Sequence, residues 1–375
     1  MITPFNPFLL TGYVSPEYFC GRKNETKMLI SALRNGRNVT LVSPRRMGKT
    51  GLIRHVFHQA KQRGGVCCYY VDLYQTDSLA SLVRQLGEEV LGTLDTREMK
   101  IVRSVASFFR SLRPAITVDP VTGELKFAID VQPQMAEQSL AEIFSYMQKS
   151  GKRCYVAFDE FQTVASYADK NVEALLRAHI QHLTSVQFIF SGSQRHVLEN
   201  MFTSAARPFY QSAQMMHLGN IDKDVYRAFA EEKLKAHGQE LTVEGFDDVY
   251  DSLAGHTWYI QVILNRLYES GEKLLTADYV ERMMQNVVAE NEATYHTFLT
   301  LVTPSQGKLL ASVAKEGFVR ELLSKQFIGQ YGLGAVSTVR SAAKALIDKE
   351  LLLQDERGYQ VYDRFFSLWL SKSYV

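Results

Sequence analysis

Residues 39–53 decide the fold, and they read VTLVSPRRMGKTGLI. The first four are the β-prone, mostly apolar residues of a buried strand, and GLI opens an amphipathic helix. SPRRMGKT fits the phosphate-binding pattern G-x-x-x-x-G-K-[ST], except that Ser43 stands where the first glycine is expected. The alternative is a chance Gly-Lys-Thr at the start of a helix. The strand before the motif and the helix after it supply the context that a phosphate-binding loop requires, so they favour nucleotide binding.

Each key residue of this loop has a chemical reason for its position. Gly48 lets the backbone approach a phosphate without a Cβ in the way, and amide groups at the helix start attract anions. Lys49 reaches the outer phosphates as a point charge, and the Thr50 hydroxyl can bind Mg²⁺. The predicted nucleotide-binding residues of the loop are Ser43, Pro44, Arg45, Arg46, Met47, Gly48, Lys49, Thr50 and Gly51.

The composition is that of a folded protein with several domains. The chain has 375 residues, of which 46% are hydrophobic, and this length predicts two or three domains. A net charge of +2 does not by itself argue for nucleic acid. The four cysteines have no metal-ligand spacing, so we interpret them as reduced thiols. Without a signal-peptide pattern or a run of ~18 apolar residues, we expect a cytoplasmic protein with no membrane partner.

A second chemical site follows the apolar run CYVAF at residues 154–158. Asp159 and Glu160 come directly after this predicted strand. Downstream of a phosphate-binding loop, the first carboxylate would hold the Mg²⁺ between the terminal phosphates, and the second would activate the attacking water. The alternative is a strand that ends in ordinary acidic loop residues. Pairing with Lys49 favours the functional interpretation, because each motif supports the other.

Three more runs complete a predicted sheet, at residues 66–71, 186–190 and 214–218. Strands separated by helices or insertions are typical of a parallel, doubly wound α/β sheet, which binds ligands at the carboxyl ends of its strands. Ser191 and Ser193 follow one such end and are candidate donors to the terminal phosphate. We therefore predict a P-loop NTPase core.

A turn and an insertion flank this core. FCGR at residues 19–22, followed by Glu25, opens a helix. From the residues alone a surface turn with an Arg22–Glu25 pair is favoured, and contact with the nucleotide base is the alternative. Residues 93–134 are less regular, and their centre at 115–130 alternates apolar and polar residues around DPVTG, which predicts a β-hairpin. We interpret this segment as an insertion of unknown function.

Two further domains are predicted after residue 220. The helical spacing of residues 222–300, without strand runs, predicts a helical lid domain. Its GHTWY segment at residues 255–259 is interpreted either as a sensor of nucleotide state or as a glycine turn with a core tryptophan. The predicted domains are residues 1–220, 221–300 and 301–375.

The last domain is predicted to be a winged helix. Its helices are expected at residues 305–314, 319–331 and 336–349, with a two-stranded wing around DERG. Residues 300–375 hold ten basic and seven acidic side chains, a net charge of +3, which is weakly basic for a DNA-binding domain. DNA, a protein partner and intramolecular docking all remain open. The polar positions offered by the third helix are Ser337, Thr338, Arg340, Ser341 and Lys344.

Four of these features together resemble one family. They are FCGR with Glu25, SPRRMGKT, FDEF at residues 158–161, and the ending YDRFF with Trp369. Over essentially its whole length the chain is similar to the archaeal-type P-loop ATPase family, a STAND-like branch related to the AAA+ ATPases. The resemblance implies an ATPase core, a helical lid and a C-terminal winged helix, with ATP and Mg²⁺ as cofactors. It also implies that Gly21 and Arg22 contact the adenine side of the nucleotide.

The chain departs from the family pattern at two places. Ser43 replaces the usual glycine of the loop, and Gln211 and Ser212 stand where relatives often have Gly-Arg after Pro-x-Tyr. The second departure removes the expected arginine finger. Arg207 or Arg195 would have to take its place.

The sequence therefore predicts an ATP-hydrolysing molecular switch. Lys49 and Thr50 bind the phosphates and Mg²⁺, Asp159 supports the metal, Glu160 activates water, and Ser191 and Arg207 assist. The winged helix would engage DNA or a protein partner, and a nucleotide-dependent oligomer is one expected form. The alternative is a non-catalytic, nucleotide-gated DNA-binding or adaptor protein with vestigial hydrolysis. A kinase on the same loop is disfavoured, because no acceptor-substrate pocket is evident.

Overall fold

The structure is a computed structural model that describes residues 5–92, 109, 111, 113–118, 125–355 and 358–373. The chain divides into two compact units. Gly12–Gly219 forms the sheet unit, and Met1–Thr11 together with Asn220–Val375 forms the helical unit. Each unit has its own core and is described by itself.

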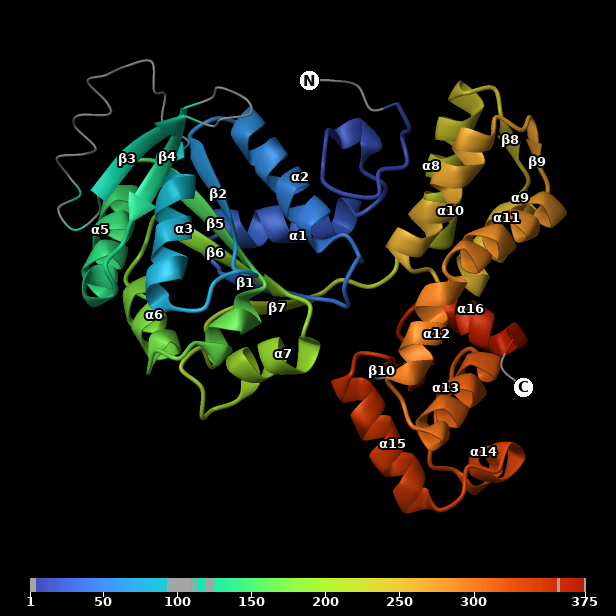
Figure 1. Ribbon diagram of the computed structural model, residues 1–375. Coiled ribbons are helices and arrows are strands. Elements are labelled where there is room, and N and C mark those ends of the chain that lie inside the picture. The colour runs from blue at the N-terminus through green and yellow to red at the C-terminus, as the bar shows by residue number, and fades with distance from the viewer. Residues whose placement is uncertain are drawn as a thin grey trace. The chain divides into compact units, whose positions relative to one another are not determined.

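A five-stranded parallel sheet in the order β2-β5-β6-β1-β7 is the centre of the sheet unit (Figure 1). All four residues of β1, the strand before the loop, are buried, as expected for an inner strand of a parallel sheet. The predicted parallel α/β sheet is confirmed. The strands are β1 (Val39–Val42), β2 (Val66–Asp72), β5 (Arg153–Asp159), β6 (Val186–Gly192) and β7 (Gln214–His217).

Helices cover both faces of this sheet, because alternate strand residues point to opposite sides. Tyr155 and Ala157 of β5 pack with residues of α1 and α2 on one face, whereas Val156 and Phe158 pack with residues of α3, α5, α6 and α7 on the other (Figure 1). The sheet is therefore doubly wound. The helices are α1 (Lys23–Arg34), α2 (Lys49–Gln62), α3 (Leu79–Gly92), α5 (Ala136–Lys149), α6 (Val172–Ile180) and α7 (Arg195–Thr203), with short 3₁₀ turns at Pro16–Tyr18, Pro133–Met135 and Phe161–Ser166.

The predicted hairpin is present as the antiparallel pair β3 (Arg113–Val118) and β4 (Leu125–Asp130). Its DPVTG turn and residues 93–108 lie outside the described residues. The hairpin packs on α3, where Gly87 leaves room for Ile129: a Cβ on Gly87 would lie 2.7 Å from the Ile129 Cδ1. The insertion therefore continues the core on that face of the sheet.

The helical unit begins with five helices and takes in the start of the chain. Phe8 is fully buried and makes edge contacts with the rings of Phe229 and Tyr268. Asn6 and Asn265 tie the segment down by donating to the carbonyl oxygens of Asn265 and Phe8, respectively, each at 2.9 Å. The helices are α8 (Lys223–Ala236), α9 (Val243–Ser252), α10 (Thr257–Ser270), α11 (Ala277–Glu290) and α12 (Glu292–Thr300).

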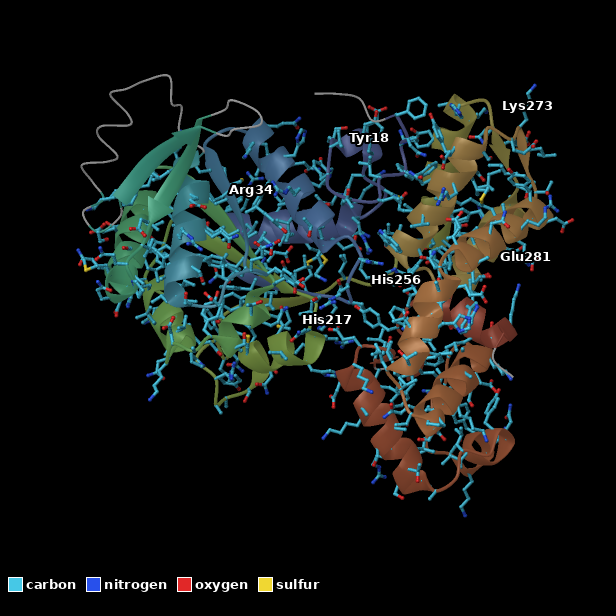
Figure 2. The ribbon with its side chains drawn as sticks, in the orientation of Figure 1. Tyr18, Arg34, His217, His256, Lys273 and Glu281 are labelled. Atoms are coloured by element: carbon cyan, nitrogen blue, oxygen red, sulfur yellow. The ribbon has the colours of Figure 1, made fainter. Side chains whose placement is uncertain are left out.

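The expectation that residues 222–300 hold no strand is wrong in one detail. β8 (Glu240–Leu241) and β9 (Leu274–Leu275) form a small parallel pair. The Glu240 amide donates to the carbonyl oxygen of Lys273 at 2.8 Å. Lys273, labelled in Figure 2, lies just before β9. Two residues are too few to produce an alternating sequence pattern, so this pairing left no signal.

The winged helix is confirmed, with corrections at its second helix and its wing. The expected helix at residues 319–331 begins only at Lys325, because Val319 pairs with Tyr359 and adds to the wing. Ser324 caps the shortened helix by accepting a hydrogen bond from the Phe327 amide. The elements are α13 (Pro304–Glu316), α14 (Lys325–Tyr331), α15 (Val336–Asp348), β10 (Leu352–Gln354), β11 (Tyr359–Val361) and α16 (Arg364–Ser373).

The terminal YDRFF segment and Trp369 belong largely to α16, which the sequence pattern did not identify as a helix. Asp363 starts it by accepting a hydrogen bond from the Phe366 amide at 2.9 Å. Phe366 and Trp369 then pack against Tyr295 of α12. This ending therefore closes the core of the winged helix. Within the described residues, no helix combines the length and the apolar character needed to cross a bilayer.

Candidate nucleotide-binding site

The loop between β1 and α2 turns tightly, with two residues in the left-handed region of backbone conformation. Gly48 caps α2 with φ of +91°, in the left-handed region that favours glycine. Arg46 also has a positive φ, of +62°, two residues earlier. The chain therefore enters the first turn of α2 through a bend with positive φ, a conformation that glycine adopts most readily. This agrees with the reason given above for a glycine at position 48.

Lys49 is buried with its ammonium group inside this loop. Its Nζ donates to the carbonyl oxygens of Ser43 and Pro44, each at 3.0 Å, and to the Ser43 hydroxyl at 3.3 Å. Burial lowers the pKa of Lys49, although the charges of Asp159 and Glu160 oppose this shift. Ser43, the departure from the expected glycine, thus supplies one more oxygen for the lysine. The loop therefore holds the ammonium group of Lys49 at the place where the outer phosphates are expected.

Asp159, at the end of β5, is the centre of a hydrogen-bond cluster. Its Oδ2 accepts from the Thr50 hydroxyl at 3.0 Å and from the hydroxyl of Tyr70. Its Oδ1 accepts from the Ser191 hydroxyl at 2.5 Å and from the amide of Glu160 at 3.1 Å. The structure therefore brings the loop, the acidic strand end and β6 together.

Ser191 lies inside β6 and not after it, because that strand runs two residues further than predicted, to Gly192. Its hydroxyl points to Asp159 and is fully buried. Tyr70 of β2 was not among the predicted residues. Burial raises its pKa, and the charge of Asp159 raises it further, so the phenol stays protonated and acts as a donor.

Glu160 turns its carboxylate toward the end of β6. Its φ of +54° is in the left-handed region, and its Oε2 accepts from the hydroxyl of Ser193 at 2.9 Å, from the amide of Ser193 at 3.3 Å and from Gln162 at 2.5 Å. Gly192 makes room for Gln162, since a Cβ there would lie 1.9 Å from the Gln162 Oε1. Arg45 of the loop reaches the same Ser193 hydroxyl at 3.4 Å.

The turn before α1 contacts the loop directly. Arg22 is only 6% exposed, and its guanidinium donates to the Met47 carbonyl oxygen at 3.2 Å and to Glu25 at 3.0 Å. The Arg22–Glu25 pair is present, but the interpretation as a surface turn is wrong. Gly21, with φ of +63°, turns the chain so that Arg22 can point at the loop.

The two candidate arginines, Arg207 and Arg195, each form an ion pair with a glutamate. Arg207 forms an ion pair with Glu173 of α6, and Arg195 forms one with Glu199 at 2.8 Å. Among the described contacts, neither reaches Lys49 or Asp159. No signal in the sequence could have found Tyr70 or Gln162. The contacts of Tyr70 depend on β2 lying next to β5, and those of Gln162 depend on the space that Gly192 leaves.

The GHTWY segment lies in the helical unit and contains the expected glycine turn, but its buried aromatic residue is Tyr259, whereas Trp258 is only partly buried. His256 directly precedes α10 (Figure 2), and Gly255 before it has φ of +69°. Tyr259 is buried and makes an edge contact with Phe365 of α16, with ring centroids 4.9 Å apart. The segment therefore joins α10 to the winged helix.

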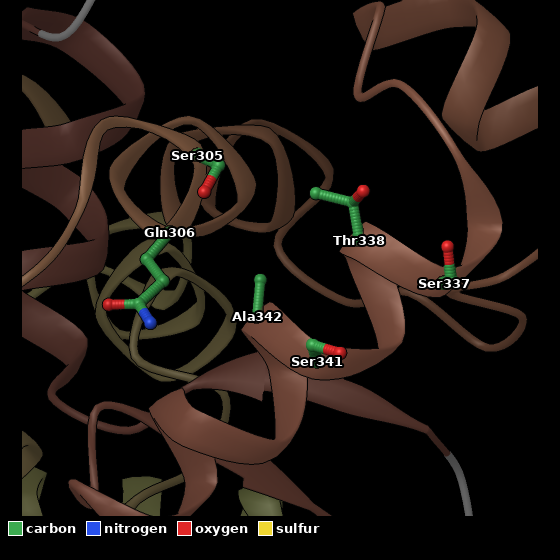
Figure 3. A pocket seen from close by; sticks show the side chains of 6 residues that line it. All are labelled: Ser305, Gln306, Ser337, Thr338, Ser341 and Ala342. Carbon is green, nitrogen blue, oxygen red and sulfur yellow. The ribbon is translucent and has the colours of Figure 1, made fainter.

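A second candidate surface lies on the winged helix. The predicted polar positions of α15 are all exposed, while Val339, Ala342 and Leu346 are buried beneath them. A pocket opens where the start of α15 faces the start of α13 (Figure 3). Its lining residues are Ser305, Gln306, Ser337, Thr338, Ser341 and Ala342.

A phosphate-binding loop after β1, with an acidic pair at the end of β5 two strands away, defines the class of P-loop NTPases. The family model described as “ATPase domain predominantly from Archaea” matches residues 19–263. That is well over half of the chain, so the protein belongs to this ATPase family. Residues 293–372 match the family described as “Probable winged helix domain”. The resemblance inferred from the sequence is confirmed.

Several solved structures share the fold. The Walker-type ATPase PABY2304 of Pyrococcus abyssi aligns with a TM-score of 0.67 at 16% identity, covering 97% of this chain and 99% of that chain. The ORC2 protein of Aeropyrum pernix, solved as ADPNP–ADP complexes, aligns at 0.60 and 16%, covering 97% and 95%. The ORC1 protein of Aeropyrum pernix, solved in complex with DNA, aligns at 0.51 and 12%, covering 98% and 96%. A comparison with curated proteins gives no match.

Proposed function

We propose that the protein is an ATP-hydrolysing molecular switch of the AAA+/STAND-like type. The observation that carries this proposal is the hydrogen bond of 3.0 Å between the hydroxyl of Thr50 and the carboxylate of Asp159. It joins the first turn of the loop helix to the acidic end of β5, beside the buried ammonium of Lys49. A cation site between these two oxygens is what hydrolysis of a terminal phosphate requires.

The residues present fit Mg²⁺. Thr50 and Asp159 offer hard oxygen atoms, and the described residues contain no cluster of three or more His, Cys, Asp or Glu side chains that could hold a metal. Mg²⁺ is normally bound by one or two carboxylates together with substrate phosphates, so a single carboxylate suits it. When bound, the ion neutralises charge that develops on the phosphates.

The chain's own residues would divide the remaining work. Lys49 can exchange the carbonyl oxygens of Ser43 and Pro44 for phosphate oxygens without leaving the loop. Glu160 is the base that takes a proton from the attacking water, and Ser193 and Gln162 set the direction of its carboxylate. Gly21 and Arg22 support the loop from the adenine side. Each of these residues belongs to the sheet unit.

Replacing Glu160 by glutamine tests this assignment. Since an amide cannot accept the proton, we expect turnover to fall by about 10²–10⁴-fold while ATP binding is kept. Glu137→Gln, an exposed glutamate on α5, is the control and should match the parent. Equal hydrolysis by Glu160→Gln and the parent would remove Glu160 from the mechanism. Tight ATP binding without turnover in the parent would favour the non-catalytic alternative.

The same assay should be run over a range of protein concentrations. Arg207 and Arg195 are engaged with Glu173 and Glu199, so we expect the arginine finger to come from a second copy in a nucleotide-dependent oligomer. An arginine finger can be worth ~10³–10⁵ in rate. Turnover per molecule should therefore rise with concentration. A constant value would place the finger within one chain.

The winged helix would carry the output of the switch, with DNA as the first partner to test. Arg340 and Lys344 are exposed on α15 and would meet phosphates if this helix enters a groove, and the ORC1 structure with the same fold is a DNA complex. Affinity for duplex DNA should fall steeply with salt, and Arg340→Glu should reduce the salt slope by about 1. The control is Lys315→Glu, which changes a lysine in the last turn of α13. Absence of binding at ~50 mM salt, with and without ATP, would favour a protein partner.

A further inference from the structure

We infer that Tyr70 is a positioning residue of the metal site, whose hydroxyl donates to the Oδ2 of Asp159 and competes with Mg²⁺ for that oxygen. This inference rests on the proposed function, because it assumes that Mg²⁺ and ATP bind at the loop. It assigns a role to a residue on β2, outside both sequence motifs. Tyr70 would then set how much Mg²⁺ the protein needs before the site is organised for hydrolysis.

Strand pairing places Tyr70 beside the acidic strand end. β2 and β5 are parallel neighbours, with Tyr70 in register with Ala157 and Asp72 in register with Asp159. Residues two apart on a strand share a face, so Tyr70 and Asp159 point to the same side of the sheet. The Tyr70 hydroxyl reaches forward along that face and donates to the Oδ2 of Asp159.

The same hydroxyl also lies against the loop helix. It is 3.4 Å from the Oγ1 of Thr50, and that oxygen donates to the same Oδ2 of Asp159 at 3.0 Å. The two oxygens expected to face the metal are therefore both in contact with one phenol. A phenol has a single proton, so Tyr70 donates to Asp159 and contacts Thr50 without donating to it.

The ring is held where it can do this. The guanidinium of Arg54, one turn after Thr50 on α2, lies 4.2 Å from the centroid of the Tyr70 ring, within the range of a cation–π interaction. At the backbone, the Tyr70 amide donates to Glu89 of α3 at 3.2 Å. These contacts fix the ring independently of its hydroxyl. Replacing Tyr70 by phenylalanine therefore removes the hydroxyl and keeps the packing.

Mg²⁺ and the Tyr70 hydroxyl would compete for the same carboxylate oxygen, the Oδ2 of Asp159. Mg²⁺ requires near-octahedral oxygen ligands at about 2.0–2.1 Å and keeps several waters. Thr50 and Tyr70 both donate to the Oδ2 of Asp159, so protons already take two acceptor positions of the carboxylate that would hold the ion. An ion held by Asp159 would have to compete with the phenol for that oxygen. The Tyr70 hydroxyl would therefore weaken the binding of Mg²⁺ at Asp159.

The test compares Tyr70→Phe with its parent in a full-length Glu160→Gln background, where ATP is not consumed. The readout is the Mg²⁺ concentration that gives half of the fluorescence change of a bound mant-ATP, with protein in excess. Loss of a hydrogen bond to a charged group predicts that this concentration falls about tenfold. Affinity for mant-ATP in EDTA should not change, which separates an effect on the metal from a general effect on the loop.

Tyr69→Phe is the matched control, since it removes a phenol from the same strand but on the face packed with α3 and α5. It should match the parent. An unchanged or higher Mg²⁺ requirement in Tyr70→Phe would overturn the inference, because the hydroxyl would then be a bystander or a support for the bound ion. If the parent binds no mant-ATP at all, the proposed function fails instead.

Discussion

The contact between Arg22 and the phosphate-binding loop gives a prediction whose size can be worked out. Arg22 is buried, donates to the Met47 carbonyl oxygen and to Glu25, and has φ of +58°. Replacing it by alanine removes a charged donor from the buried Met47 oxygen, at a cost of about 1.5–3 kcal/mol. Replacing it by glycine removes the same contacts but also relieves the left-handed backbone, which returns roughly 1 kcal/mol.

The two variants therefore separate the side chain from the backbone. We expect Arg22→Ala to lower the free energy of unfolding of the sheet unit by about 1.5–3 kcal/mol, and Arg22→Gly by about 1 kcal/mol less. Both should weaken ATP binding by about tenfold, because the loop loses the same support. Glu25→Gln keeps the bond to Met47 and should have a small effect on both quantities.

The assay exploits where the tryptophans lie. Trp258 and Trp369 are the two tryptophans of the chain, and both belong to the helical unit. Urea unfolding followed by far-UV circular dichroism should therefore shift in the Arg22 variants, while the transition seen by tryptophan fluorescence should not. ATP affinity is measured separately with mant-ATP. If Arg22→Ala binds ATP as tightly as the parent, the turn does not support the loop, and the reasoning from its geometry is refuted.

Two further predictions concern stability. Burial lowers the pKa of His55, whose ring hydrogen-bonds the Tyr13 hydroxyl at 3.0 Å. Below about pH 6.5, His55 is therefore protonated more fully in the unfolded chain than in the folded chain. The free energy of unfolding by urea should fall as pH is lowered from about 7 to about 5, and His55→Gln should make this fall less steep. An equally steep fall in His55→Gln and the parent would contradict this role of His55. Phe8→Ala should destabilise the helical unit by about 3–5 kcal/mol, because Phe8 is fully buried against Phe229 and Tyr268. The tryptophan-detected transition should report the loss, and an unchanged midpoint would show that this segment is not part of that core.

Local sequence signals predicted the elements of the sheet unit closely. The five strands were found because each is a short apolar run bounded by polar or turn residues, as in residues 154–158 before Asp159. Gly48 was found because its backbone geometry and the phosphate-loop pattern demand the same residue. These features depend on a few neighbouring residues, so the sequence alone contains them.

Features that depend on distant partners were missed. The start of α14 was placed six residues too early, because only pairing with Tyr359, forty residues away, draws Val319 into the wing. Tyr70 was missed because its role depends on β2 lying next to β5 in the sheet. The burial of Arg22 likewise comes from Met47, twenty-five residues later. A helix-start or strand-end pattern carries no information about such neighbours.

The membership of Met1–Thr11 in the helical unit means that the chain passes between the two units twice, once after Thr11 and once after Gly219. A single protease cut at the second crossing would leave the sheet unit covalently joined to a buried piece of the other unit, through Phe8. The two fragments would then copurify until the helical unit itself unfolds. Expressing residues 220–375 alone would also leave that unit without the aromatic side chain that fills its core. The two cores meet in the sequence after Gly219, but cutting the chain there would not yield two independent domains, because Phe8 belongs to the second core.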